Sequence, residues 1–200
     1  MDKYGCENKT SWEKTVEFHG HECPGLAIGY RATELALQEL GTDRSVDEEL
    51  IAIVEHNSCG VDALQTLAGC SFGKGNLFYK DLGKSVYTIA RRKDSNAVRV
   101  AVKYGATFDP DFRTLKERAA SASATEKDRA LYREALQKRI KSILSAGSEV
   151  FDVRRVAIEL PRPASIYQTL QCSVCGEGVM EPRARLKDGR VVCIPCEGEI

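Results

Sequence analysis

Residues 18–25 read Phe-His-Gly-His-Glu-Cys-Pro-Gly and bring two imidazoles and a thiol together within a few positions. Pro24 suits the first turn of a helix, because the amide hydrogen that it lacks would have no partner there. The apolar periodicity after Pro24 predicts a helix to about Leu40, ended by Gly41. Cys23 is therefore expected at a helix N-terminus, where backbone amides and the helix dipole favour a thiolate. We interpret this stretch as the edge of a metal or redox site.

A second cysteine follows the next predicted element. The apolar run 50–55 predicts a buried strand, and it leads through Asn-Ser-Cys59-Gly into a helix over 61–68 that Gly69 ends. Junctions of this kind converge at one edge of a sheet. We therefore expect Cys59 beside Cys23, with His56 or Cys70 as reserve ligands.

The residue types favour a metal at this site. His19 or His21, Cys23 and Cys59 could surround one ion, and imidazoles with thiolates suit Zn²⁺ or another borderline-soft metal. An incomplete ligand set would leave an open position for water or substrate. Three ligands so close in sequence are not expected all to reach one ion, so some would be catalytic or would support the ligands. The alternative is a metal-free site with Cys23 as nucleophile, His21 as base and Cys59 beside them.

The glycine-rich turn over 69–76 contains one cation, Lys74. It lacks a residue between the glycines of a phosphate loop, and Gly75 replaces the Ser or Thr that would bind Mg²⁺. Lys74 with neighbouring amides is a candidate cofactor-binding residue for a small anion. A plain turn explains the same residues equally well.

The last 30 residues contain two Cys-x-x-Cys pairs, Cys172 with Cys175 and Cys193 with Cys196. Their separation is typical of a structural zinc site, because two tight turns can present four thiolates as a tetrahedron. A segment of this size has too small a core to fold well alone, so the metal would supply folding free energy.

Composition limits the remaining possibilities. The 200 residues include 29 basic and 29 acidic side chains, which gives no support for nucleic acid as a partner. No apolar run approaches the roughly 18 residues of a membrane span, and residues 1–8 do not resemble a signal peptide, so we expect a cytoplasmic protein. Residues 71–171 lack cysteine, and Pro161-Arg162-Pro163 predicts a boundary between domains at 1–163 and 164–200. Cys6 is interpreted as an ordinary surface or core residue.

The remaining pattern predicts an α+β domain. A short helix is expected over 11–18, a β-hairpin over 85–91 and 97–102, and a strand over 150–160. Asp109-Pro110 is interpreted as a break. A long helix from Thr125 to Ser145 has Asp128 in its first turn as part of a capping box. This helix could present a surface to a second copy, so a homodimer is expected.

Three segments resemble, in order, the motifs of the FmdE family, which is named for a component of tungsten and molybdenum formylmethanofuran dehydrogenases. They are 18–31 (FHGHECPGLAIGYR), 57–65 (NSCGVDALQ) and 69–77 (GCSFGKGNL). The resemblance implies a thioredoxin-like mixed β-sheet flanked by helices, with a small treble-clef or zinc-ribbon domain after it. It also implies that His19, His21, Cys23 and Cys59 mark an active site able to hold metal.

Two functional hypotheses follow. The first is a metal-dependent enzyme or redox factor that uses the N-terminal His/Cys cluster. The second is a non-catalytic accessory protein that contacts a molybdenum or tungsten oxidoreductase through its zinc finger. A nucleic-acid-binding zinc protein has little support from the balanced charge.

Overall fold

A computed structural model describes residues 9–198 of the chain, and Cys6 lies outside that range. The chain divides into two compact units, with the division after Pro163. The two units are described separately below.

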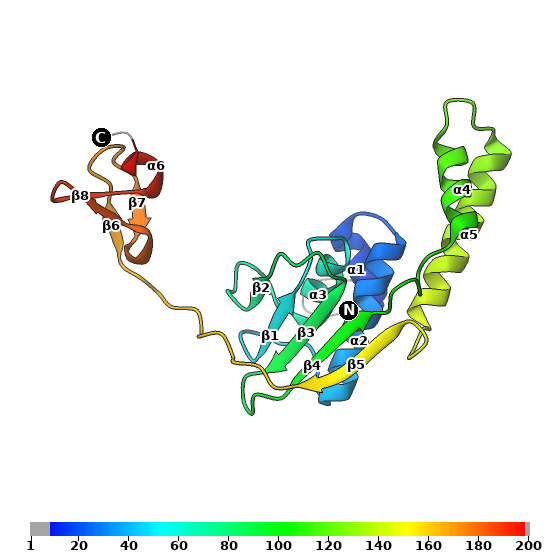
Figure 1. Ribbon diagram of the computed structural model, residues 1–200, viewed down its shortest axis with the longest axis horizontal. Helices are drawn as coiled ribbons and strands as arrows, with labels where there is room; N and C mark the ends of the chain where they lie inside the picture. The colour runs from blue at the N-terminus through cyan, green and yellow to red at the C-terminus, as the bar shows by residue number, and fades with distance from the viewer. Residues whose placement is uncertain (1–8, 199–200) are drawn as a thin grey trace. The chain divides into compact units, whose positions relative to one another are not determined.

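The first unit is built on a five-stranded mixed sheet in the order β2-β1-β3-β4-β5, as the resemblance implied (Figure 1). β1 and β2 are parallel, whereas the other neighbours are antiparallel. The strands are β1 (Leu50–Val54), β2 (Leu77–Tyr79), β3 (Val86–Arg91), β4 (Ala97–Val102) and β5 (Phe151–Val156). The predicted strand at 50–55 and the predicted hairpin are confirmed. The thioredoxin-like layout stays a prediction.

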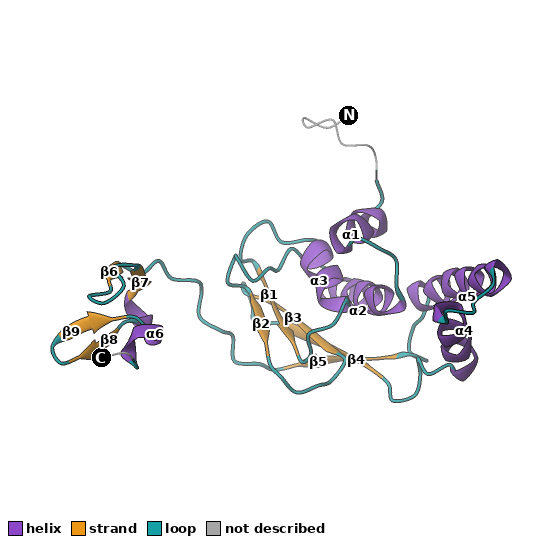
Figure 2. Ribbon diagram, turned by 90° about the horizontal axis from the view of Figure 1, so that it is seen from above, coloured by secondary structure: helices purple, strands orange, loops and turns teal. Residues whose placement is uncertain are grey.

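Three helices cover one face of this sheet: α1 (Ser11–His19), α2 (Pro24–Leu40) and α3 (Gly60–Ala68) (Figure 2). The predicted apolar face of α2 is confirmed, since Leu26, Tyr30, Leu37 and Leu40 are all buried. Gly41 takes a left-handed conformation and ends α2 as expected, with φ 61°. The opposite face of the sheet buries Ile51, Ile53, Ala90 and Ala97 against β2 and the chain after β5.

Two glycines let α2 and α3 cross at very short range. A Cβ on Gly29 would meet the Cα of Gly60 at 2.2 Å, and one on Gly60 would meet the Tyr87 hydroxyl at 2.0 Å. Only glycine fits at such a crossing, because real side-chain atoms do not approach backbone this closely. The crossing sets the first turns of the two helices, with Cys23 and Cys59 at their caps, next to each other.

A helical hairpin, α4 (Pro110–Ala120) and α5 (Glu126–Leu144), extends from the sheet, and α5 also packs on α2. The predicted long helix and its capping box are confirmed, with Thr125 and Asp128 bonded reciprocally. The interpretation of Asp109-Pro110 as a simple break was wrong. Asp109 caps α4 by accepting from the Phe112 N–H at 2.9 Å, and Pro110 takes the first helical position.

Two strands also differ from expectation. β2 was not predicted, because three residues after a glycine turn carry little periodicity. β5 ends at Val156 rather than near Leu160. Ile158 and Leu160 instead pack against the far face of the sheet.

The second unit contains two short antiparallel ribbons and a single turn of helix. They are β6 (Thr169–Gln171), β7 (Gly178–Met180), β8 (Arg185–Lys187), β9 (Arg190–Val192) and α6 (Ile194–Glu197), with a 3₁₀ turn at Glu181–Arg183. The predicted Asp188-Gly189 turn is confirmed, with φ values of 50° and 73° between β8 and β9.

Candidate metal centre

The turn between α1 and α2 positions the His/Cys stretch. α1 ends at His19, and Gly20 leaves the helix in a left-handed conformation with φ 93°. The chain then re-enters helix at Pro24, so that Cys23 becomes the N-cap of α2. Its sulfur accepts a hydrogen bond from the Leu26 N–H at 3.3 Å. Cys23 is therefore at a helix N-terminus as predicted, although the preceding element is a helix and not a strand.

Asp62 fixes the orientation of His19. Nδ1 of His19 lies 2.7 Å from Oδ2 of Asp62, and an ionised carboxylate can only accept, so Nδ1 carries the proton. Nε2 is then free to act as a ligand, and it faces Sγ of Cys23 at 3.8 Å. Paired carboxylate and histidine side chains orient metal ligands in this way in many proteins. The sequence prediction missed Asp62, although it lies one turn after Cys59 within the 57–65 motif.

The three ligand atoms of His19, His21 and Cys23 all lie within 4.8 Å of one another. The expectation that they would not face one ion is thereby corrected. The left-handed Gly20 folds the chain back, and the rings of His19 and His21 stack with centroids 4.6 Å apart. Nitrogen and sulfur ligands on a tetrahedral zinc ion lie about 3.6 Å apart, so the spacing of His19 and Cys23 fits a shared ion.

Cys59 lies beside Cys23 but is not part of this group of three. A Cβ on Gly25 would meet Cβ of Cys59 at 3.3 Å and the sulfurs of Cys59 and Cys23 at 3.7 and 3.9 Å. The two thiols thus flank Gly25. Burial raises the pKa of the Cys23 thiol, and the nearby Cys59 adds to that effect, while the Leu26 amide opposes it. The assignment of Cys59 as a ligand or catalytic residue stays a prediction.

A cavity of about 600 Å³ opens beside the cluster. His21, Cys23 and Cys59 contribute to one wall, and the α4–α5 hairpin forms the other. This volume lies within the usual range of ligand sites, about 300–1,000 Å³. The hairpin, which the sequence prediction lacked, is therefore part of the candidate site.

The two reserve ligands lie elsewhere. Cys70 is fully buried in the main core, and burial raises its pKa to about 12. His56 packs edge-on against Tyr87, with Nε2 3.1 Å from the tyrosine hydroxyl, and burial lowers its pKa. Neither side chain belongs to the group of three ligands or lines the cavity.

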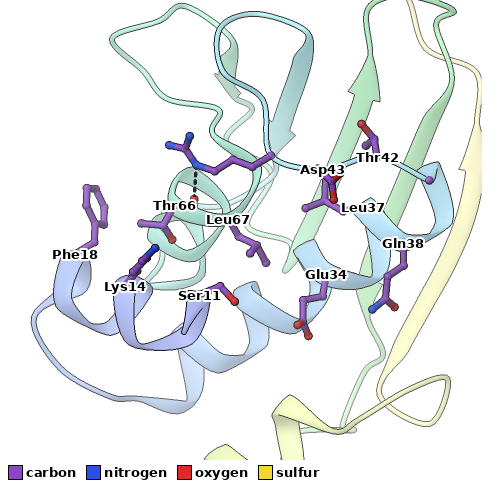
Figure 3. Close-up of a pocket in the computed structure, with 12 residues that line it drawn as sticks. Ser11, Lys14, Phe18, Glu34, Leu37, Gln38, Thr42, Asp43, Thr66 and Leu67 are labelled. Atoms are coloured by element: carbon purple, nitrogen blue, oxygen red, sulfur yellow. Dashed lines mark hydrogen bonds between the residues drawn. The ribbon is translucent and has the colours of Figure 1, made fainter. Parts of the chain in front are cut away.

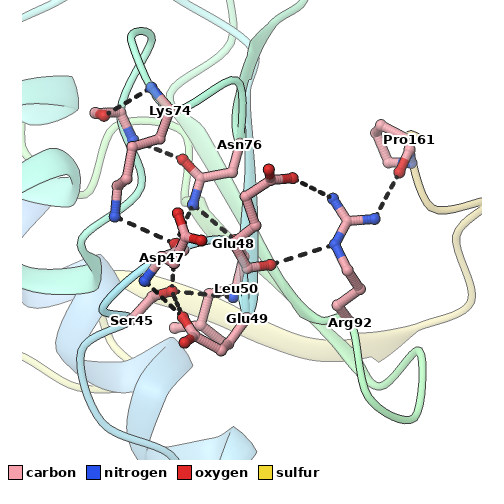
Figure 4. A network of polar contacts seen from close by, with 10 residues as sticks. Ser45, Asp47, Glu48, Glu49, Leu50, Lys74, Asn76, Arg92 and Pro161 are labelled. Atoms are coloured by element: carbon pink, nitrogen blue, oxygen red, sulfur yellow. Dashed lines mark hydrogen bonds and ion pairs between the residues drawn. The ribbon is translucent and has the colours of Figure 1, made fainter. Parts of the chain in front are cut away.

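Lys74 binds the loop before β1 (Figure 4). Its ammonium donates to the carbonyl oxygens of Val46 and Asp47 at 3.1 and 3.2 Å. Asn76, which is buried, reaches the same loop through the carbonyls of Asp47 and Leu50. These bonds give Lys74 a structural part in joining two loops, and the anion site stays a prediction.

A larger cavity, of about 980 Å³, lies away from the cluster between α1, α3 and the end of α2 (Figure 3). Lys14 and Arg44 line it together with Glu34 and Asp43, and none of the three clustered ligands does. Mixed charges of this kind do not converge on one ligand chemistry.

The four C-terminal cysteines form the second candidate metal site. Their sulfurs all lie within 4.8 Å of one another, and those of Cys175 and Cys193 are 3.9 Å apart. Four thiolates around tetrahedral zinc would be about 3.8 Å apart, so the set fits this metal. Backbone amides of Cys175, Cys193 and Val174 lower the pKa of Cys172 to about 6. Such amide bonds favour the thiolate form that zinc requires.

No helix within residues 9–198 is both long and apolar enough to cross a membrane.

Comparisons with known proteins place both units. Residues 18–152 match the family model "FmdE, Molybdenum formylmethanofuran dehydrogenase operon", and residues 165–200 match the "Prokaryotic dksA/traR C4-type zinc finger". A solved structure from Syntrophus aciditrophicus, an FmdE-like protein of the tungsten formylmethanofuran dehydrogenase type, aligns with a TM-score of 0.62. The alignment covers 94% of this chain and 90% of that one at 24% identity, which supports a shared fold.

A curated relative is more similar in sequence. The "Probable S-adenosyl-L-methionine-binding protein" of Archaeoglobus fulgidus is 36% identical over 196 residues. That match covers 92% of this chain but 52% of the relative, so the chain spans about half of the relative's length. The FmdE model alone matches more than half of the present chain, in the segment that contains His19, Cys23, Cys59 and Asp62. The chain belongs to the FmdE family.

Proposed function

We propose that the first unit is a metal-dependent catalytic unit in which His19, His21 and Cys23 bind a zinc ion. The observation that carries the proposal is the convergence of three ligand atoms within 4.8 Å of one another, next to a cavity that His21 and Cys23 also line. Zinc sites with three protein ligands and an open position are typical of enzymes, whereas structural sites have four.

The surrounding residues support this proposal. Asp62 holds His19 so that Nε2 is the free nitrogen, and the N-terminal turn of α2 holds Cys23. A bound zinc ion would supply Lewis acidity and would lower the pKa of a bound water. Cys59, on the same cavity wall, is the thiol placed to act on a bound ligand or to complete the metal shell. The metal-free alternative, with Cys23 as nucleophile, leaves the Asp62–His19 orientation without a purpose.

Metal content tests the proposal. The full-length protein, purified without chelators, should contain two zinc ions per chain, one for each ligand group. Cys23→Ser should lower the count to one, and Cys172→Ser should lower it to one through the other site. Cys59→Ser is the matched comparison, and it separates a ligand from a neighbouring thiol. A count of one in the natural protein that Cys23→Ser leaves unchanged would refute the metal centre.

An accessory role is a second candidate, which the names of the matched family and of the solved structure favour. In it, the four-cysteine finger would contact a molybdenum or tungsten oxidoreductase. Affinity purification of the full chain from its own cells tests this, with Cys172→Ser as the disrupted form. Recovery of an oxidoreductase component with the natural chain and not with the variant is expected, and equal recovery would count against it.

The name of the Archaeoglobus relative suggests S-adenosylmethionine as a ligand, but it does not say which half of that protein binds it. Equilibrium dialysis of the present chain with radiolabelled S-adenosylmethionine decides whether this half is sufficient.

A further inference from the structure

The α4–α5 hairpin supplies the wall of the cavity that faces the metal ligands. Phe112 and Lys116 come from α4, and Tyr132, Leu136 and Arg139 come from α5. Side chains from a separate element opposite a metal centre are positioned to select what reaches the metal.

Part of this wall is apolar. The rings of Phe112 and Tyr132 pack with centroids 5.5 Å apart at 37°, and Leu136 lies on the same side of the cavity. A ligand that fills this space would bury an apolar body against these side chains, because that surface gains most from the removal of water.

Two of the three charged lining groups are already engaged. Arg139 pairs with Asp109 at 3.0 Å, donates to the Thr107 carbonyl and lies 4.7 Å from the centre of the Phe112 ring. Glu22 accepts from Trp12 at 3.2 Å and from Gln137 at 2.5 Å, so both of its oxygens have donors.

Lys116 is different. Its ammonium forms no ion pair with any residue in the part of the chain that the structure describes. It is exposed on α4 and lines the same cavity as His21 and Cys23. The charge available to a ligand in this cavity is therefore positive.

We propose that the cavity binds a small organic acid, whose anionic group pairs with Lys116 and whose apolar body packs on Phe112, Tyr132 and Leu136. This inference rests on the proposed function for the role of the metal, since the ligand's other end would lie beside His21 and Cys23. Lys116 is then the residue that selects anions over neutral molecules of the same shape.

Fluorescence of 8-anilinonaphthalene-1-sulfonate, an aromatic anion, tests the proposal on the zinc-loaded full chain. Competition by 4-phenylbutyrate and by neutral 4-phenylbutanamide compares two probes of similar shape. An aryl phosphate, phenyl phosphate, is the third competitor and distinguishes a carboxylate site from a phosphate site. Lys116→Gln removes the charge and Lys116→Arg keeps it. Lys127→Gln is the matched control, since it removes an exposed lysine of α5 that does not line the cavity.

Lys116→Gln should weaken binding of 4-phenylbutyrate by about three- to tenfold, as expected for one partly solvated charge contact. Lys116→Arg should stay within about twofold and Lys127→Gln should have no effect, by the same reasoning. Equal affinities in Lys116→Gln and Lys127→Gln, or an amide that competes as well as the acid, would overturn the proposal. Phenyl phosphate stronger than 4-phenylbutyrate would overturn the choice of a carboxylic acid.

Zinc content measured on the same samples separates this inference from the proposed function. Lys116→Gln should retain both zinc ions. Dependence on Lys116 together with a zinc count that Cys23→Ser does not change would leave the anion site standing and remove the metal centre. Normal zinc with no dependence on Lys116 would do the reverse.

Discussion

Replacing Gly29 by alanine should weaken the first unit strongly, because the added methyl group has no room. Its carbon would lie 2.2 Å from both the Cα and the carbonyl oxygen of Gly60. Ordinary contact needs roughly 3.4–4 Å, so α2 and α3 would have to move apart by more than about 1 Å. Overpacking in a core costs about 1–3 kcal/mol. We expect the upper end, about 3 kcal/mol, because backbone cannot rotate away as a side chain can.

Thermal unfolding followed by tryptophan fluorescence measures this effect in the first unit alone. The chain contains one tryptophan, Trp12, which packs edge-on against Tyr30 with centroids 5.2 Å apart. A loss of about 3 kcal/mol corresponds to a fall in Tm of about 6–12 °C for a domain of this size. Gly73→Ala is the matched control, because a Cβ there meets nothing within 4 Å.

The same substitution should also disturb the candidate site. The crossing sets the caps of α2 and α3, so Gly29→Ala should reduce the zinc bound by the first unit while the finger keeps its own. A Tm for Gly29→Ala within about 2 °C of the Gly73→Ala value would refute the reasoning, since it would mean that the helices do not cross as closely as described.

Three further predictions concern the two sites and the core. Asp62→Asn should weaken zinc binding by the first unit about 10- to 100-fold, as loss of a carboxylate that orients a histidine ligand does elsewhere, and competition with a chromophoric chelator measures it; an unchanged affinity would contradict the assigned role. Cys172→Ser should make the segment after Pro163 sensitive to protease without moving the Tm reported by Trp12, because a small segment depends on its metal for folding; a shift in that Tm would argue against independent units. Burial lowers the pKa of His56, so the stability it contributes is present above about pH 6.5 and is lost as the pH falls through the lowered folded-state pKa. The Tm of chelator-treated protein should therefore fall on acidification less steeply in His56→Gln, and parallel curves would remove this explanation.

Local signals in the sequence were sufficient for most elements of the first unit. Pro24 and Gly41 mark the ends of α2, and Thr125 with Asp128 marks the start of α5. These signals act over one helical turn, so they can be recognised without knowledge of the fold.

The α4–α5 hairpin shows where local signals mislead. Asp109-Pro110 interrupts the preceding pattern, but the same two residues form a helix start, and the apolar stripe of α4 is weak because none of its residues is buried. The consequence reaches the site, since without α4 the cavity that faces His21 and Cys23 could not be foreseen.

The candidate site was only partly predictable for a geometric reason. Nearness of His19, His21 and Cys23 in sequence argued against a common ion, yet a single left-handed residue, Gly20, turns the chain so that their ligand atoms converge. The partner of His19 is Asp62, which is distant in sequence and is brought in by the close helix crossing. Contacts of that kind depend on tertiary packing, which periodicity does not specify.

Anomalous scattering at the zinc edge, from crystals of the full-length protein grown with zinc, tests the metal centre most directly. The account predicts two peaks per chain: one among Cys172, Cys175, Cys193 and Cys196, and one contacted by His19 Nε2, His21 and Cys23. A finger peak with no density at His19 and Cys23 would contradict it, because it would leave the first unit without the metal on which its proposed chemistry depends.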